Sequence, residues 1–263
     1  MKKLFLFCAA LLFAGALKAQ DRDLERLENS PRHHEWINMD QDGRNVRGFL
    51  VFPEKAENAK TLIVIHENRG LTDWVRAMAD QLAEMGYIAL APDLLSDFDN
   101  SKKSTRDFAN QDDAREGIYA LDNQQVMKDL DSAFEYLQTV DGGSGEVSVI
   151  GFCWGGSQTY NYATHQPNIS EALVFYGTGP KDPEQIAKIN APVYGFYGEN
   201  DQRVNATIET SEEMMKEKGK SFEYEIYDEA GHAYMRSGEG PDASEGNRLA
   251  REESLERIKA ILN

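Results

Sequence analysis

Short runs rich in β-branched and aromatic residues alternate with longer amphipathic segments from about Val46 to the C-terminus. The predicted strands cover residues 46–52, 61–66, 87–92, 147–152, 172–176, 193–197 and 222–227. Between them, helical spacing of apolar residues predicts helices over 73–85, 122–139, 206–218 and 244–261, and in the stretch after Cys153. Uninterrupted apolar runs such as TLIVI and VSVIGF are typical of strands covered on both faces. The pattern predicts an α/β fold with a mostly parallel, twisted sheet and helices on both faces.

Two segments do not follow this alternation. Residues 20–45 are polar, and we expect an N-terminal extension or a short antiparallel hairpin there, ahead of a single domain over 46–263. Residues 93–121 are long and charged for a connection within a domain. They are either a functional lid or insertion, or a solvated surface excursion with one short helix.

Residues 1–19, MKKLFLFCAALLFAGALKA, have the pattern of a secretory signal peptide. Two lysines precede an apolar stretch from Leu4 to Leu17, and the small residue Ala19 offers a cleavage site. The stretch is shorter than the roughly 20 residues that a spanning helix needs, so an uncleaved anchor is the less favoured alternative. We therefore expect a secreted protein, periplasmic or extracellular, with no stable membrane insertion after cleavage.

Charge and cysteine content narrow the function further. The chain has 28 basic and 45 acidic residues, a net charge of −17, which disfavours nucleic acid and anionic lipid as partners. Cleavage after Ala19 removes Cys8 and leaves Cys153 as the remaining cysteine, so no intramolecular disulfide can form. A free thiol is prone to oxidation in an oxidising compartment, so we expect Cys153 to have a function that requires it.

Cys153 lies in the pattern glycine, any residue, nucleophile, any residue, glycine, between a strand and a helix. The backbone at such a nucleophile is strained. Gly151 and Gly155 flank it because side chains at these two positions would block the tight passage from strand to helix. The N-terminus of a helix also favours a thiolate. The competing interpretation is a buried structural cysteine beside a glycine-rich turn.

The residues downstream favour the interpretation of Cys153 as a nucleophile over that of a structural cysteine. Asp201 follows the strand at 193–197, and His232 follows the strand at 222–227. Nucleophile, then acid, then histidine at successive strand ends is the chain order of α/β-hydrolase triads. His232 would take the thiol proton while Asp201 fixes its tautomer. Glu199 is a weaker rival for the acid, and three other histidines occupy no strand end: His33, His34 and His165.

The segment His66-Glu67-Asn68-Arg69-Gly70 follows the strand at 61–66. It lacks the second histidine of a zinc motif and does not lie inside a helix, so we expect no metal. In α/β-hydrolases this loop supplies one backbone N–H of the oxyanion hole, and the residue after the nucleophile supplies the other. Here the donors would be Asn68 and Trp154, each worth about 3 kcal/mol to the transition state.

Together, the segments HENRG, APDL, GFCWGG, GENDQRV and DEAGHAYMR resemble the dienelactone hydrolase family of α/β-hydrolases, over roughly residue 46 to the C-terminus. The resemblance implies that Cys153, Asp201 and His232 form the triad. It also implies that Glu67 contacts the resting thiol until a substrate carboxylate displaces it.

The family implies two arginines for an anionic lactone, and Arg236 matches one of them. The other would fall near Ser96 and Asp97, where none exists. Arg69 could replace it, although a surface role for Arg69 is slightly favoured.

We expect a small-molecule ester or lactone as substrate, an acyl-thioenzyme on Cys153 and no cofactor. The alternatives are an esterase or thioesterase for a non-anionic substrate and a non-catalytic ligand-binding protein; the sequence gives no oligomeric state.

Overall fold

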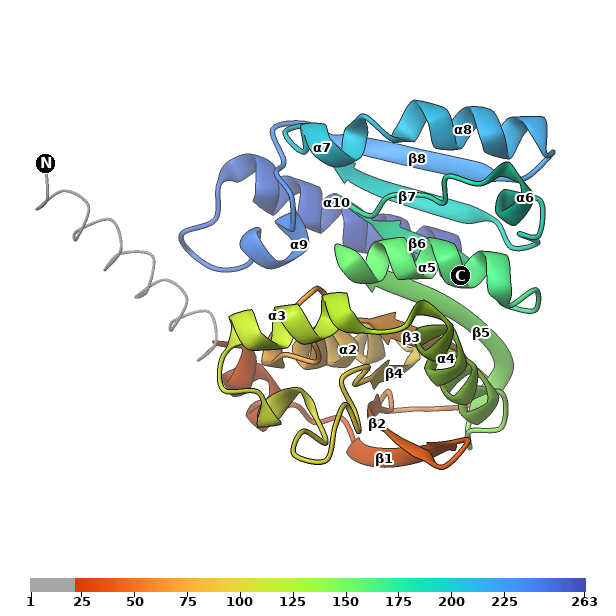
Figure 1. The fold of residues 1–263 in the computed structure, drawn as a ribbon. Coiled ribbons are helices and arrows are strands. Elements are labelled where there is room, and N and C mark those ends of the chain that lie inside the picture. Colours follow the sequence, from red (N-terminus) through yellow and green to blue (C-terminus); the bar gives the residue numbers. More distant parts are fainter. Residues whose placement is uncertain (1–21) are drawn as a thin grey trace, which may run out of the picture.

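The computed structural model of the protein describes residues 22–263 (Figure 1). The predicted signal peptide, residues 1–19, lies outside the described residues, so cleavage and export stay predictions. In residues 22–263, no helix combines the length and the apolar character needed to cross a bilayer.

The described residues form an eight-stranded sheet in the order β1-β2-β4-β3-β5-β6-β7-β8. The strands β3 to β8 pair in parallel, whereas β1 and β2 run antiparallel to their neighbours. This confirms the predicted mostly parallel α/β sheet. The strands are β1 (His34–Gln41), β2 (Arg44–Val51), β3 (Ala59–Ile65), β4 (Ile88–Pro92), β5 (Gly143–Phe152), β6 (Ala172–Phe175), β7 (Val193–Gly198) and β8 (Phe222–Tyr227).

Helices cover both faces of the sheet (Figure 1). The longer ones are α2 (Asp73–Glu84), α3 (Gln111–Ala120), α4 (Asn123–Gln138), α5 (Trp154–His165), α8 (Ile208–Glu217) and α10 (Glu245–Leu262), and the short ones are η1 (Thr105–Asp107), α6 (Pro183–Ile186), α7 (Gln202–Asn205) and α9 (Tyr234–Ser237). The helix predicted at 206–218 begins later than expected. Asp201 instead caps the separate turn α7 ahead of it.

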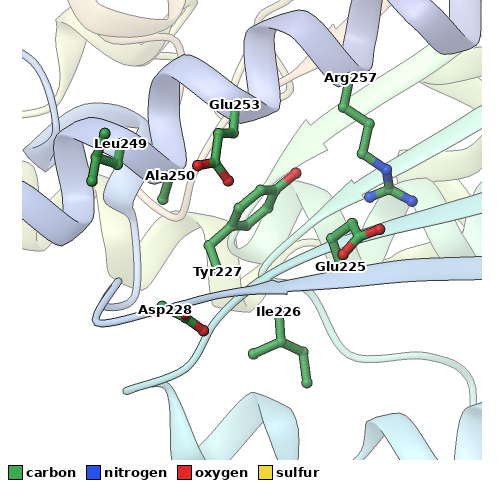
Figure 2. Close-up of a pocket in the computed structure, with 8 residues that line it drawn as sticks. All are labelled: Glu225, Ile226, Tyr227, Asp228, Leu249, Ala250, Glu253 and Arg257. Atoms are coloured by element: carbon green, nitrogen blue, oxygen red, sulfur yellow. The ribbon is translucent and has the colours of Figure 1, made fainter.

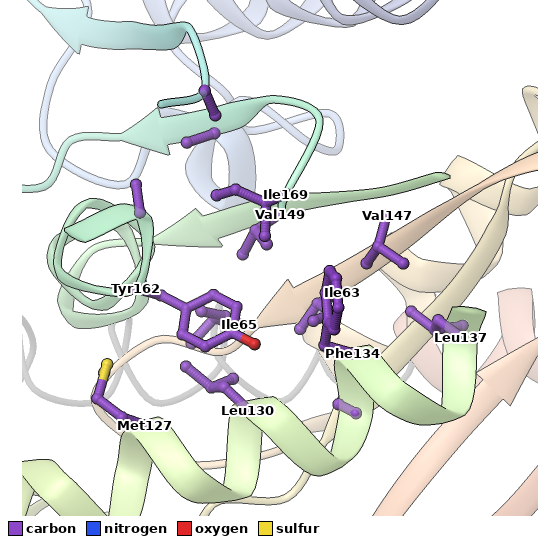
Figure 3. Close-up of a cluster of buried hydrophobic side chains, with 14 of the residues drawn as sticks. Ile63, Ile65, Met127, Leu130, Phe134, Leu137, Val147, Val149, Tyr162 and Ile169 are labelled. Atoms are coloured by element: carbon purple, nitrogen blue, oxygen red, sulfur yellow. The ribbon is translucent and has the colours of Figure 1, made fainter. Parts of the chain in front are cut away.

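The sheet separates two hydrophobic clusters, which explains the uninterrupted apolar strands. Side chains of β3 alternate, so that Ile63 and Ile65 join one cluster while Leu62 and Val64 join the other. The first cluster packs against α4 and α5, and Figure 3 shows α4 residues such as Phe134 facing β3 and β5. The second packs against α2 and α10. Both layers hold the carboxyl ends of the central strands in fixed positions.

The N-terminal segment contains more structure than its polar composition suggests. Residues 22–29 form a helix that the sequence analysis did not predict, and β1 pairs with β2 as the edge strand of the main sheet. Arg26 and Arg32 both bind the buried carboxylate of Asp80 on α2. Ion pairs across the sequence therefore attach this helix, and a search for helical apolar spacing cannot detect them.

Residues 93–121 fold into turns, η1 and α3. The carboxylate of Asp93 accepts hydrogen bonds from the backbone N–H and the hydroxyl of Thr105. Leu95 and Ile118 are buried, and Trp154 packs against their cluster. The segment thus lies beside the residue that follows Cys153 in the chain.

Candidate active site

Four loops at the carboxyl ends of parallel strands bring the candidate residues together. Glu67 and Asn68 follow β3, Cys153 follows β5, Asp201 follows β7 and His232 follows β8. Because these strands are parallel, their carboxyl ends meet at one edge of the sheet, where ligands bind in open α/β folds.

Cys153 occupies a strained turn between β5 and α5. Its φ angle is +57° and its ψ angle is −113°, outside the regions that side chains favour. A Cβ on Gly151 would collide with the carbonyl oxygen of Gly155, and a Cβ on Gly155 would collide with the carbonyl oxygens of Ile65 and His66. The two glycines are therefore sterically required, as predicted from the motif.

His232 connects Cys153 to Asp201. Its Nε2 lies 3.1 Å from the Cys153 Sγ, and its Nδ1 lies 2.5 Å from the Asp201 Oδ2. Asp201 is buried, whereas the rival Glu199 is exposed and accepts a hydrogen bond from the Glu229 N–H. The carboxylate of Asp201 favours a proton on Nδ1, which leaves the Nε2 lone pair for the thiol proton.

The thiol of Cys153 is protonated in the resting site. Burial, followed by the negative charge of Glu67, raises its pKa to about 11. The Trp154 N–H and two arginines act in the opposite direction with smaller effect. Proton transfer to His232 is therefore needed before the sulfur can act as a nucleophile at neutral pH.

Glu67 is buried and pairs with Arg236. The Arg236 Nε donates a hydrogen bond of 2.9 Å to the Glu67 Oε2, and the Glu67 charge raises the pKa of Arg236. Within residues 22–263, the Cys153 Sγ interacts with the His232 Nε2 and the Trp154 N–H, and no hydrogen bond joins it to Glu67. Glu67 therefore acts on the thiol through its charge in this structure, and direct contact with the thiol stays a prediction.

The two predicted oxyanion donors differ in their resting contacts. The Trp154 N–H, in the first turn of α5, faces the Cys153 sulfur. The Asn68 N–H has no hydrogen-bond acceptor among the described residues, and the Asn68 side chain turns to the Tyr119 hydroxyl on α3. Among the described residues the Asn68 N–H is therefore open to a ligand oxygen, whereas the Trp154 N–H exchanges its contact with the sulfur for one with the ligand oxygen.

The Arg69 side chain extends to α3. It is exposed, and its Nη1 donates a hydrogen bond of 2.7 Å to Gln111 on α3. Near residues 96 and 97, Ser96 is buried and its hydroxyl accepts a hydrogen bond from the Arg47 N–H. The structure thus places Arg236 in contact with Glu67, and the charges of Arg203 and Arg236 both act on the Cys153 thiol.

Tyr176 is a site residue that the sequence analysis did not identify. It follows β6 directly, so its position at the same sheet edge was the available signal. Its ring lies edge-on to the His232 ring at 5.1 Å, and its buried hydroxyl has no hydrogen-bond partner among residues 22–263. Tyr176 therefore limits the positions open to the imidazole.

A separate concavity of about 430 Å³ lies between β8 and α10 (Figure 2). Ile226 and Tyr227 line it from β8, and Leu249, Glu253 and Arg257 line it from α10. Its Arg257 is already engaged, because it donates to the Gly195 carbonyl and lies over the Phe196 ring. None of its lining residues belongs to the candidate site.

We expect Glu67→Gln to make Cys153 more reactive. Removing the carboxylate charge lowers the pKa of the thiol and releases Arg236 to stabilise the thiolate, so alkylation by iodoacetamide at pH 7.5 should accelerate about tenfold. The matched control is Glu199→Gln, an exposed carboxylate at a neighbouring strand end, which should leave the rate unchanged. An equal or slower rate in Glu67→Gln would contradict the electrostatic role of Glu67.

The chain is similar to known proteins in both sequence and fold. Residues 46–263 match the model of the dienelactone hydrolase family. A Methylorubrum extorquens protein named "Putative carboxymethylenebutenolidase" is 32% identical over 205 residues, covering 74% of this chain and 69% of its own. An Escherichia coli protein of the same name is 30% identical over 211 residues, covering 76% of each chain.

Among solved structures, a "Putative Dienelactone Hydrolase" from Klebsiella pneumoniae superimposes with a TM-score of 0.75 and 25% identity. The match covers 87% of this chain and 97% of the other. The chain belongs to the dienelactone hydrolase family and is an ester or lactone hydrolase.

Proposed function

We propose that Cys153, His232 and Asp201 form a catalytic triad that cleaves a small-molecule ester or lactone through an acyl-thioenzyme. The observation that carries the proposal is the position of His232, within hydrogen-bond distance of both the Cys153 sulfur and the Asp201 carboxylate. The same contacts are expected for a nucleophile, its general base and the group that orients the base.

In the first step, the Cys153 thiol transfers its proton to the His232 Nε2 while the sulfur attacks the substrate carbonyl carbon. The negative charge that develops on the carbonyl oxygen is stabilised by the N–H groups of Asn68 and Trp154. The intermediate then collapses, the carbon–oxygen bond to the leaving group breaks, and His232 returns its proton to the departing alkoxide.

In the second step, His232 takes a proton from water, and the resulting nucleophile attacks the thioester carbonyl. The carbon–sulfur bond breaks, the carboxylic acid product leaves, and the proton returns to Cys153. Asp201 stays ionised throughout and stabilises the imidazolium in both steps. One water molecule is consumed for each ester bond that is cleaved. Atoms and charges balance in both steps without a cofactor.

Arg236 is the residue placed to recognise a substrate carboxylate. A substrate carboxylate that replaced Glu67 on Arg236 would lower the pKa of Cys153 if Glu67 moved away and the substrate charge lay farther from the sulfur than the Glu67 charge does now. Substrate binding would then favour proton transfer to His232. The "carboxymethylenebutenolidase" name of the relatives is in keeping with a carboxylate-bearing lactone.

A non-anionic ester is the second candidate substrate. The charge of Arg236 is already compensated by Glu67, and residues 96 and 97 provide no second cation. The net charge of −17 also repels anions at long range.

A panel of activated esters and lactones, paired with and without a carboxylate, tests the proposal. We expect hydrolysis of at least one pair, and mass spectrometry after acid quenching should find the acyl group on Cys153. A preference for the carboxylate-bearing member would favour the anionic substrate, and the opposite preference the neutral one. Absence of both turnover and adduct across the panel would overturn the triad assignment.

A further inference from the structure

We propose that His66 is a positioning residue that orients both backbone donors of the oxyanion hole, an inference that rests on the proposed function. His66 is fully buried at the end of β3, immediately before Glu67. It does not contact the Cys153 sulfur, so its effect on the reaction is transmitted through the groups that it touches.

The first contact fixes the peptide that carries the Asn68 N–H. The His66 Nδ1 lies 2.8 Å from the carbonyl oxygen of Glu67. That oxygen and the Asn68 N–H belong to the same planar trans peptide group and point in opposite directions. A hydrogen bond that anchors the Glu67 carbonyl therefore sets the direction of the Asn68 N–H.

The second contact fixes the tautomer of His66. The Leu94 N–H donates to the His66 Nε2 at 3.3 Å, so Nε2 is an acceptor and the proton resides on Nδ1. Burial lowers the pKa of His66 and outweighs the opposing charges of the two nearby carboxylates, Asp93 and Glu67. A neutral His66 with its proton on Nδ1 is the form that can donate to the Glu67 carbonyl.

The third contact reaches the other donor. The His66 ring stacks on the Trp154 indole with a centroid separation of 5.6 Å and an interplanar angle of 13°. The backbone next to Trp154 is equally constrained, because Gly155 leaves no space for a Cβ beside the Ile65 and His66 carbonyls. His66 therefore contacts both the loop after β3 and the start of α5. The N–H groups of Asn68 and Trp154 are thus both oriented relative to the His66 ring.

Two substitutions separate the hydrogen bonds of His66. In His66→Asn, the side-chain amide can still donate from the Nδ1 position, whereas in His66→Gln the amide oxygen can still accept from Leu94 at the Nε2 position. Both variants lose the ring that stacks on Trp154. Higher activity in His66→Asn than in His66→Gln therefore shows that the hydrogen bond to the Glu67 carbonyl matters more than the one from the Leu94 N–H.

We expect His66→Gln to lower kcat for a substrate of the wild-type protein about 10- to 100-fold, with KM within about threefold. His66→Asn should retain at least about fivefold more kcat than His66→Gln. Alkylation of Cys153 by iodoacetamide should stay within about twofold of wild type in both variants, because this reaction develops no oxyanion. A merely structural role would lower hydrolysis and alkylation in parallel.

Unchanged kcat in both variants, a parallel loss of alkylation, or higher activity in His66→Gln than in His66→Asn would overturn the role of His66 alone. Absence of turnover in the wild-type protein would overturn both this inference and the proposed function. If the variants do not fold, ¹⁵N NMR of the histidines in the wild-type protein gives the answer. We expect a neutral His66 protonated at Nδ1 between pH 6 and pH 8, and an imidazolium or a proton on Nε2 would overturn the inference.

Discussion

Replacing Cys153 by alanine should abolish hydrolysis, with kcat lowered by at least about 10⁴-fold for every substrate of the wild-type protein. The expected loss is large because, in the proposed mechanism, the sulfur is the atom that forms the acyl intermediate, and alanine has no nucleophilic group. Initial rates with the best substrate from the ester and lactone panel provide the measurement. Retention of more than about a tenth of wild-type kcat would show that the reaction does not proceed through this sulfur.

The same substitution should leave the fold intact, which makes the loss of activity interpretable. Cysteine and alanine both carry a Cβ, so the strain at a φ angle of +57° is unchanged by the exchange. His232 keeps its hydrogen bond to Asp201, and thermal unfolding should occur within a few degrees of wild type. His232→Ala is the companion variant. It keeps the Cys153 thiol but removes the imidazole that accepts the thiol proton, so hydrolysis should fall in this variant as well.

The proximity of the three proposed triad residues could be predicted because each position depends on local sequence and on one rule of topology. The spacing of Gly151, Cys153 and Gly155 encodes a turn that only glycine can flank. Asp201 and His232 directly follow strands whose apolar runs are recognisable, and parallel strands bring their carboxyl ends to one edge. Loops at strand ends are therefore predictable as neighbours even when they are far apart in the chain.

Side-chain pairings within the site were less predictable. Glu67 and Arg236 are separated by 169 positions, and their hydrogen bond depends on the exact rotation of both side chains. The same limit applies to Arg69, which shares a loop with Glu67 and Asn68 but extends to Gln111 on α3. Strand-end position places a backbone at the site, whereas packing against α3 decides where the long side chain goes.

The helix at residues 22–29 shows a different limit of the sequence analysis. It has few apolar residues, and it is attached through charged groups around Asp80, a fully buried residue on α2. The Asp80 carboxylate accepts hydrogen bonds from Arg26, Arg32, Ser30 and His34. Hydrophobic periodicity carries no information about such a polar network, so the element was missed although its contacts are extensive.

Asp80→Asn should destabilise the protein by about 3 kcal/mol, because it leaves the guanidinium of Arg32 buried without a counter-charge. The side chain of Arg32 is 7% exposed and that of Asp80 is 0% exposed, so water compensates little for the loss. Urea unfolding at pH 7 measures the difference in the free energy of unfolding. Glu84→Gln is the matched control: Glu84 binds the same Arg26 from the same helix but is 55% exposed, and its loss should cost about 0.5 kcal/mol or less.

The pH dependence of this difference tests the electrostatic origin of the effect. Burial alone would raise the pKa of Asp80, but hydrogen bonds from Arg32, Ser30 and His34 outweigh burial and lower the pKa to about 2. A carboxylate whose pKa is lowered by folding stabilises the protein above its unfolded pKa, and this contribution disappears as pH falls through the folded pKa. The wild-type advantage over Asp80→Asn should therefore be complete above about pH 5 and shrink between about pH 4 and pH 2. A difference that stays constant over this interval would show that Asp80 acts through its shape and packing rather than through its charge.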